Sequence, residues 1–253
     1  MIYLGWSFSF VVINNISKEV DEIKLLNEIG FNVTKVNKNV NIEQAMALNL
    51  KSNSLFIAYF NNCLMIFDNL KITEYINPSK QFSYSEARLV VNYPKSNILS
   101  LACSSTVNAL IYSIISNKTK VRYNNISDMD DKTEFGEPTK VEQNIYNKAK
   151  LINNQYVWEE GIKESEMYEE FAFELLNEWI GVRLDKTALL DNISFSTYKI
   201  EAIQENIGKL YVVETVKIKD NFPTRLKKGF LFAIVVTFIL VLLLLIIDKI
   251  SNL

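Results

Sequence analysis

The residues best suited to chemistry lie in an acidic stretch near the middle of the chain. This stretch carries five carboxylates, which are Asp128, Asp130, Asp131, Glu134 and Glu137. Carboxylate oxygens are the ligands that Mg²⁺ and Ca²⁺ prefer, and carboxylates at alternate positions of a loop can converge on one ion. The stretch lacks the glycine and the ligand spacing of an EF-hand. A metal-binding loop is therefore one interpretation, and a solvated acidic loop without a ligand is the interpretation we favour.

A second acidic set recurs at helical spacing. Glu170, Glu174 and Glu178 lie four residues apart within the segment Glu166 to Ile180, and apolar residues occupy the opposite face of the same helical pattern. Carboxylates at this spacing repel one another slightly. A solvated helix face explains them, and a docking surface for a basic partner protein is the functional alternative.

The composition excludes several kinds of catalysis, because the chain contains no histidine. Ser-His-Asp and Cys-His mechanisms and histidine-bound zinc are therefore excluded. The two cysteines, Cys63 and Cys103, are too few for an all-cysteine zinc site, and both lie in apolar runs typical of buried thiols. Glycine-rich phosphate-binding motifs do not occur either. These observations favour a protein that is not an enzyme, and they predict no cofactor.

The elements that must position these residues predict an α+β domain over residues 1–218. Two apolar strands, Ser54–Phe60 and Cys63–Phe67, flank Asn61-Asn62 and predict a hairpin at the centre of a mixed or antiparallel sheet. Ser83 and Glu86 have the spacing of a capping box and predict a helix start. Several further helices are expected, and Pro138 predicts the first turn of one that reaches Lys150. The segment from Lys71 to Ile76 reads as another strand.

Whether residues 1–218 form one domain remains open at this point. The region after about Asp128 either completes the sheet or forms a second domain that begins near residue 128.

The chain ends in its most apolar segment. Residues 229–247, GFLFAIVVTFILVLLLLII, carry no charge and would span about 28 Å as a helix, close to the ~30 Å hydrocarbon core of a bilayer. We predict a transmembrane helix from Gly229 to Ile247, preceded by a basic linker, 219–228, and followed by a short tail, 248–253. Gly229, Ala233 and Thr237 recur every four residues, and such a ridge of small residues could let two helices associate.

The flanking charges predict the orientation of this helix. Arg225, Lys227 and Lys228 precede it, whereas only Lys249 follows it, so the cationic N-terminal flank should stay on the cytoplasmic side. We therefore expect a tail-anchored, single-pass protein of the inner (cytoplasmic) membrane with its N-terminal domain in the cytoplasm. The abundance of Lys, Asn and Ile is typical of an AT-rich bacterial genome.

The predicted partners follow from anchoring and charge. A net charge of −2 provides no positive field for nucleic acid, so we expect none to bind. The membrane and either a protein partner or a second copy held through the anchor are the expected partners. The sequence favours a non-enzymatic binding or sensing module, such as a bacterial signalling or defence effector. The alternatives are a metal-dependent hydrolase at the membrane surface that uses the acidic loop, and an immunity-type membrane protein.

Overall fold

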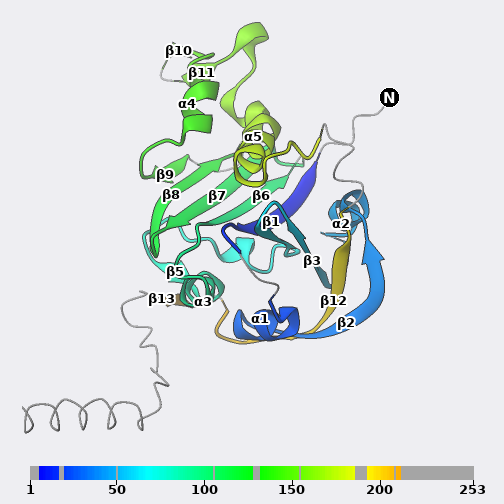
Figure 1. Cartoon of the computed structure of the whole chain (residues 1–253). Helices are drawn as coiled ribbons and strands as arrows, with labels where there is room; N and C mark the ends of the chain where they lie inside the picture. Colours follow the sequence, from blue (N-terminus) through cyan, green and yellow to red (C-terminus); the bar gives the residue numbers. More distant parts are fainter. Residues whose placement is uncertain are drawn as a thin grey trace, which may run out of the picture. The chain divides into compact units, whose positions relative to one another are not determined.

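The computed structural model describes residues 6–16, 20–49, 51–104, 106–127, 132–153, 155–185, 193–207 and 209–211. These residues form an antiparallel sheet of nine strands in the order β2-β12-β3-β4-β1-β6-β7-β8-β9 (Figure 1). The strands are β1 (Ser7–Ile13), β2 (Phe31–Val40), β3 (Ser54–Phe60), β4 (Cys63–Phe67), β6 (Ile98–Ser104), β7 (Ala109–Ser116), β8 (Thr119–Ile126), β9 (Thr133–Phe135) and β12 (Phe195–Ile203). Strands β9 and β12, which follow residue 128, belong to the same sheet as the strands before it.

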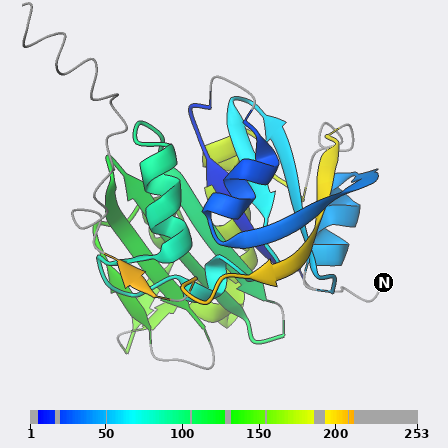
Figure 2. The same ribbon diagram turned by 90° about the horizontal axis from the view of Figure 1, so that it is seen from below.

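Helices cover both faces of this sheet. Helices α1 (Glu22–Glu28) and α3 (Tyr84–Asn92) pack on one face, and α2 (Ile42–Asn49), α4 (Lys140–Tyr146) and α5 (Tyr168–Ile180) pack on the other. Figure 1 shows α4 and α5 above the sheet and α1 and α3 below it, and Figure 2 shows α1 and α3 in front of the sheet. The prediction of an α+β domain with an antiparallel sheet and several helices is confirmed.

The central strand β1 illustrates why both faces are covered. It pairs with β4 on one side and β6 on the other. Alternate side chains of a strand point to opposite faces, so Phe8 and Phe10 join the core under α5, whereas Val11 and Ile13 join the core under α1 and α3. A strand with both faces buried must be apolar throughout, as the end of β1 is.

The predicted hairpin is present beside this central strand. Strands β3 and β4 pair from Phe56↔Phe67 to Phe60↔Cys63. Asn61 and Asn62 form the turn with φ of 47° and 59°, the left-handed conformation that asparagine tolerates.

The predicted strand from Lys71 to Ile76 is wrong, because this segment turns into a short 3₁₀ helix, η1 (Thr73–Tyr75). One oxygen of the Asp68 carboxylate, Oδ2, accepts hydrogen bonds from the backbone N–H groups of Ile72 at 2.7 Å and Thr73 at 2.8 Å. A side chain that binds nearby backbone N–H groups stabilises a turn at the expense of an extended strand.

Substitution of Asp68 by asparagine should flatten the pH dependence of stability. Burial raises the pKa of this carboxyl group above its ordinary value, although the backbone N–H groups of Ile72 and Thr73 oppose the shift. An acid whose folded-state pKa is raised favours folding below its unfolded pKa of about 4, and this contribution is lost as the pH rises through the folded-state pKa. Urea unfolding of the full chain in detergent between about pH 4 and pH 7 should therefore show a smaller loss of stability for Asp68→Asn than for the wild type. Parallel pH profiles would contradict this assignment.

The predicted membrane anchor is not part of the structure described above. Among the residues that the structure describes, no helix is both long and apolar enough to cross a membrane. The predicted transmembrane helix with Gly229, Ala233, Thr237 and Ile247, and its flank with Arg225, Lys227 and Lys228, lie outside the described residues.

Candidate functional site

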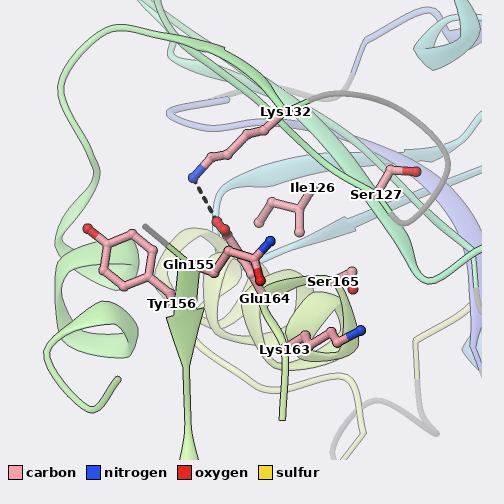
Figure 3. A pocket seen from close by; sticks show the side chains of 8 residues that line it. All are labelled: Ile126, Ser127, Lys132, Gln155, Tyr156, Lys163, Glu164 and Ser165. Atoms are coloured by element: carbon pink, nitrogen blue, oxygen red, sulfur yellow. Dashed lines mark hydrogen bonds and ion pairs between the residues drawn. The ribbon is translucent and has the colours of Figure 1, made fainter. Parts of the chain in front are cut away.

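A cavity of about 390 Å³ opens where strand β8 ends. Its other walls come from Lys132, from β11 (Gln155–Val157), which pairs with β10 (Lys150–Ile152), and from the 3₁₀ helix η3 (Glu164–Met167) with the residue before it. The lining residues are Ile126, Ser127, Lys132, Gln155, Tyr156, Lys163, Glu164 and Ser165 (Figure 3). Most of these side chains are polar, so the cavity is suited to a ligand that carries polar or charged groups.

The ammonium of Lys132 is the most closely surrounded charge of the cavity. Its Nζ lies 2.7 Å from Glu164 Oε1, and Figure 3 shows this contact as a dashed line. The same Nζ lies 3.4 Å from Glu134 Oε1 and 3.3 Å from the hydroxyl of Tyr146. It also lies 5.2 Å from the ring centroid of Tyr146 and 6.0 Å from that of Tyr156, within the range of a cation–π interaction.

The two tyrosine rings are held by an aromatic cluster that brings together α4, β11 and α5. Tyr146 and Tyr156 have ring centroids 4.6 Å apart, and Tyr146 lies 5.2 Å from Phe171. Trp158 packs beside them and donates its Nε1–H to the carbonyl of Ile145 at 3.1 Å. Because such aromatic pairs are worth more than their buried area alone, the rings keep their positions through contacts that do not involve Lys132.

The hydroxyl of Tyr146 completes this arrangement. It donates a hydrogen bond of 2.5 Å to Glu164 Oε1. Burial raises the pKa of Tyr146 far above its ordinary value, and the hydrogen bond and charge of Glu164 and the charge of Glu142 raise it further. The phenol therefore stays protonated at neutral pH and serves as a fixed donor.

Replacing Glu164 with glutamine should test how strongly this carboxylate holds the cavity together. The change removes the ion pair with Lys132 and weakens the hydrogen bond from Tyr146, and we expect the free energy of unfolding to fall by about 1 kcal/mol. Urea unfolding measures this loss, with the exposed Glu178→Gln as the matched control. A Glu164→Gln variant as stable as the control would contradict the role given to this residue.

Only two of the five predicted metal ligands belong to the part of the chain that the structure describes. Asp128, Asp130 and Asp131 lie outside it. Glu134 has both oxygens engaged, with Oε2 at 2.5 Å from Arg122 and Oε1 at 3.4 Å from Lys132, and Glu137 is exposed. Burial alone would raise the pKa of Glu134, but the hydrogen bond from Arg122 and the charge of Lys132 lower it. Within the described ranges, no three acidic or cysteine side chains gather where they could bind a metal ion.

The predicted acidic stripe of α5 meets a cation from its own chain. Arg183 Nη2 lies 3.1 Å from Glu170 Oε2, and its Nη1 binds Glu174. Gly181, with φ of 81°, ends the helix in the left-handed conformation, after which the chain returns Arg183 to the helix. This pairing relieves the repulsion expected between the carboxylates, and Glu178 stays exposed. The sequence signal for this pairing was Arg183, which lies two residues after the helix-ending Gly181.

Two further charged clusters are buried under the helices, and sequence reasoning missed both. On β8, Ile115 pairs with Lys120 and Ile114 pairs with Arg122, so Val121 is left unpaired as a β-bulge. A bulge changes the alternation of side chains, and the two cations consequently point to opposite faces of the sheet.

Each of these cations meets the capping-box glutamate of a helix on its own face. Lys120 binds Glu86 of α3 with Nζ 3.0 Å from Oε2, and Arg122 Nε lies 3.1 Å from both carboxylate oxygens of Glu142 of α4. Both glutamates also accept the backbone N–H of their N-cap residue, Ser83 or Thr139. These groups fasten helices to the sheet and lie outside the cavity.

Neither protein-family models nor curated proteins nor solved structures match this chain. The function is therefore argued from its residues and their geometry.

Proposed function

We propose that this protein is a membrane-tethered, non-enzymatic binding module, and that its ligand site is the cavity between the end of β8, β11 and η3. The observation that carries the proposal is the Lys132 ammonium held beside Glu164 and two tyrosine rings at the edge of a cavity of about 390 Å³. A volume of this size falls within the range of small-molecule sites. Charged and aromatic groups of this kind recognise polar and cationic ligands.

The state of Tyr146 supports binding over proton transfer. A general acid or base works best when its pKa lies near the operating pH. The pKa of Tyr146 is shifted away from neutrality by burial and by Glu164. The hydroxyl is thus suited to donating a hydrogen bond and unsuited to exchanging its proton.

The tether rests on the sequence of the last residues. The uncharged segment 229–247 and the cations Arg225, Lys227 and Lys228 support a single span with the domain on the cytoplasmic side. Ligand occupancy would then be reported through association or rearrangement at the anchor, for which Gly229, Ala233 and Thr237 provide the small-residue ridge. This layout suits a bacterial signalling or defence effector.

Retention of a small molecule by the purified full chain tests the proposal. The chain is extracted from membranes of the producing cells in detergent, and the compounds it releases on denaturation are identified by mass spectrometry. Gln155→Trp places a large side chain at an exposed strand position of the cavity wall, and Asn37→Trp places one at an exposed position of β2 as the matched control. A compound retained by the wild type and the control but lost from Gln155→Trp is the expected result.

Equal retention by Gln155→Trp, or no retained compound, would overturn this assignment of the site. The rival enzymatic interpretation has its own readout, because a hydrolase that uses the acidic loop should cleave bis(p-nitrophenyl) phosphate when Mg²⁺ is added. Turnover that depends on Mg²⁺ and on Asp130 would replace the binding module with that enzyme.

A further inference from the structure

The groups around the Lys132 ammonium are those of a site for an organic cation. Two carboxylates, Glu164 and Glu134, approach the ammonium at 2.7 Å and 3.4 Å, and the rings of Tyr146 and Tyr156 lie beside it. Carboxylates and aromatic faces are the groups that proteins use to bind ammonium ligands. In this structure the occupant is a side chain of the same domain.

The surrounding groups do not depend on that occupant. Tyr146 and Tyr156 are held by Trp158 and Phe171, and Glu164 is held by the hydroxyl of Tyr146. The side chain of Lys132 is 32% exposed, and partly exposed ion pairs contribute only about 0–1 kcal/mol. The site should therefore persist when Lys132 leaves, and Lys132 should leave at little cost.

The local charge favours a cation over an anion. Two carboxylates, Glu164 and Glu134, face this position, and the carboxylate of Glu164 also raises the pKa of the Tyr146 hydroxyl after burial. An anion site would need the two lysines of the cavity to converge, but Figure 3 shows the side chain of Lys163 directed away from Lys132. The neighbouring cavity gives room for the rest of a ligand whose ammonium sits at the rings.

We infer that the cavity binds a primary alkylammonium, whose charged end takes the place of the Lys132 ammonium between Glu164, Tyr146 and Tyr156. This ligand class rests on the proposed function, because it uses the same cavity. The ammonium is carried either by a free aliphatic amine or by a lysine side chain of a peptide. Lys132 acts as an internal competitor that keeps the site closed to weak ligands.

Chemical rescue of Lys132→Ala tests this inference. Butylammonium should raise the melting temperature of the full-length variant in detergent along a saturable curve. It should bind the wild type up to about fivefold more weakly, because there it must displace Lys132 at a cost of up to about 1 kcal/mol. Butanol and butyrate, which share the alkyl chain but are neutral or anionic, should have no saturable effect. The peptide Gly-Lys-Gly distinguishes the source, since a site shaped for lysine side chains binds it at least as well as butylammonium.

A second variant separates this site from general effects of amines. Adding Glu164→Gln to Lys132→Ala should abolish the rescue, whereas adding the exposed Glu178→Gln should leave it intact. Equal stabilisation by butanol, or rescue that survives Glu164→Gln, would overturn the inference. Stabilisation by butyrate alone would overturn the ligand class while leaving the cavity as a binding site. Should Lys132→Ala fail to fold, calorimetric titration of the wild type with butylammonium decides the matter, and the absence of saturable heat would refute the inference.

Discussion

Replacing Arg122 with alanine should lower the free energy of unfolding by about 3–5 kcal/mol, the usual cost of removing one partner from a buried ion pair. Arg122 is 2% exposed, and Glu142 is fully buried. The guanidinium binds both oxygens of Glu142, the carboxylate of Glu134 and the carbonyls of Phe135 and Gly136. Its removal leaves the carboxylate of Glu142 without a cation in the protein interior, and urea unfolding of the full chain in detergent measures the cost.

A double variant separates the cost of the lost contacts from the cost of an unpaired buried charge. Arg122→Met combined with Glu142→Gln removes both charges, and glutamine can still complete the capping box with Thr139. This double variant should therefore be more stable than Arg122→Ala. A Lys substitution keeps the charge but loses the planar fork of donors, so it should be intermediate. An Arg122→Ala variant within about 1 kcal/mol of the wild type would contradict the role of this network, because breaking a buried pair costs several times more.

The second large effect is expected on the opposite face of the sheet. There, Lys120→Ala should lower the free energy of unfolding by about 3 kcal/mol. The side chains of Lys120 and Glu86 are both fully buried. Lys120 has fewer hydrogen-bond partners than Arg122. Its Nζ lies 3.0 Å from Glu86 and 3.3 Å from the carbonyl of Asn77, and it also lies 5.7 Å from the ring centroid of Phe82. Glu86 keeps hydrogen bonds from Ser83 N–H and the Ser113 hydroxyl when the lysine is lost, which places this loss at the lower end of the range.

A double-mutant cycle with Lys120→Met and Glu86→Gln checks that the cost comes from the pair. The two residues share one ion pair, so the two losses should not add. Additive losses would show that each residue acts through other contacts. The ion pair between Lys120 and Glu86 would then be unimportant for stability.

The capping boxes show what the sequence can predict. Ser83 and Glu86 were predicted to start a helix from their spacing alone, and they do so at α3. The helix near Pro138 was also predicted, but both of its ends were wrong. Helix α4 runs from Lys140 to Tyr146, and Pro138 precedes its N-cap residue, Thr139. Its capping box, Thr139 with Glu142, has the same spacing as that of α3 and was not predicted.

The partners of these glutamates could not be predicted, for a physical reason. Lys120 and Arg122 are two residues apart, and regular alternation would place them on the same face of a strand. The bulge at Val121 sends them to opposite faces. A single extra residue in a strand leaves no clear mark on the sequence pattern, yet it decides which helix each cation binds.

The candidate site could not be predicted from the sequence, for a different physical reason. Tyr146, Tyr156 and Phe171 come from separate elements, and only packing brings their rings together. The prediction at this place concerned the acidic residues from Asp128 to Glu137, whereas the described part of the site is organised around Lys132 at their centre. Contacts between distant elements leave no periodicity that a sequence could reveal.

The proposal of a tethered, cytoplasmic module depends on the position of this protein at the membrane. Protease added to sealed inside-out vesicles should digest the large N-terminal part of the chain, and the same part should survive in right-side-out vesicles, because the proposed orientation places the cations of residues 225–228 on the cytoplasmic side. The chain should also stay with the lipid after a carbonate wash. Survival of the N-terminal part in inside-out vesicles, or its release by carbonate, would contradict the tethered, cytoplasmic binding module.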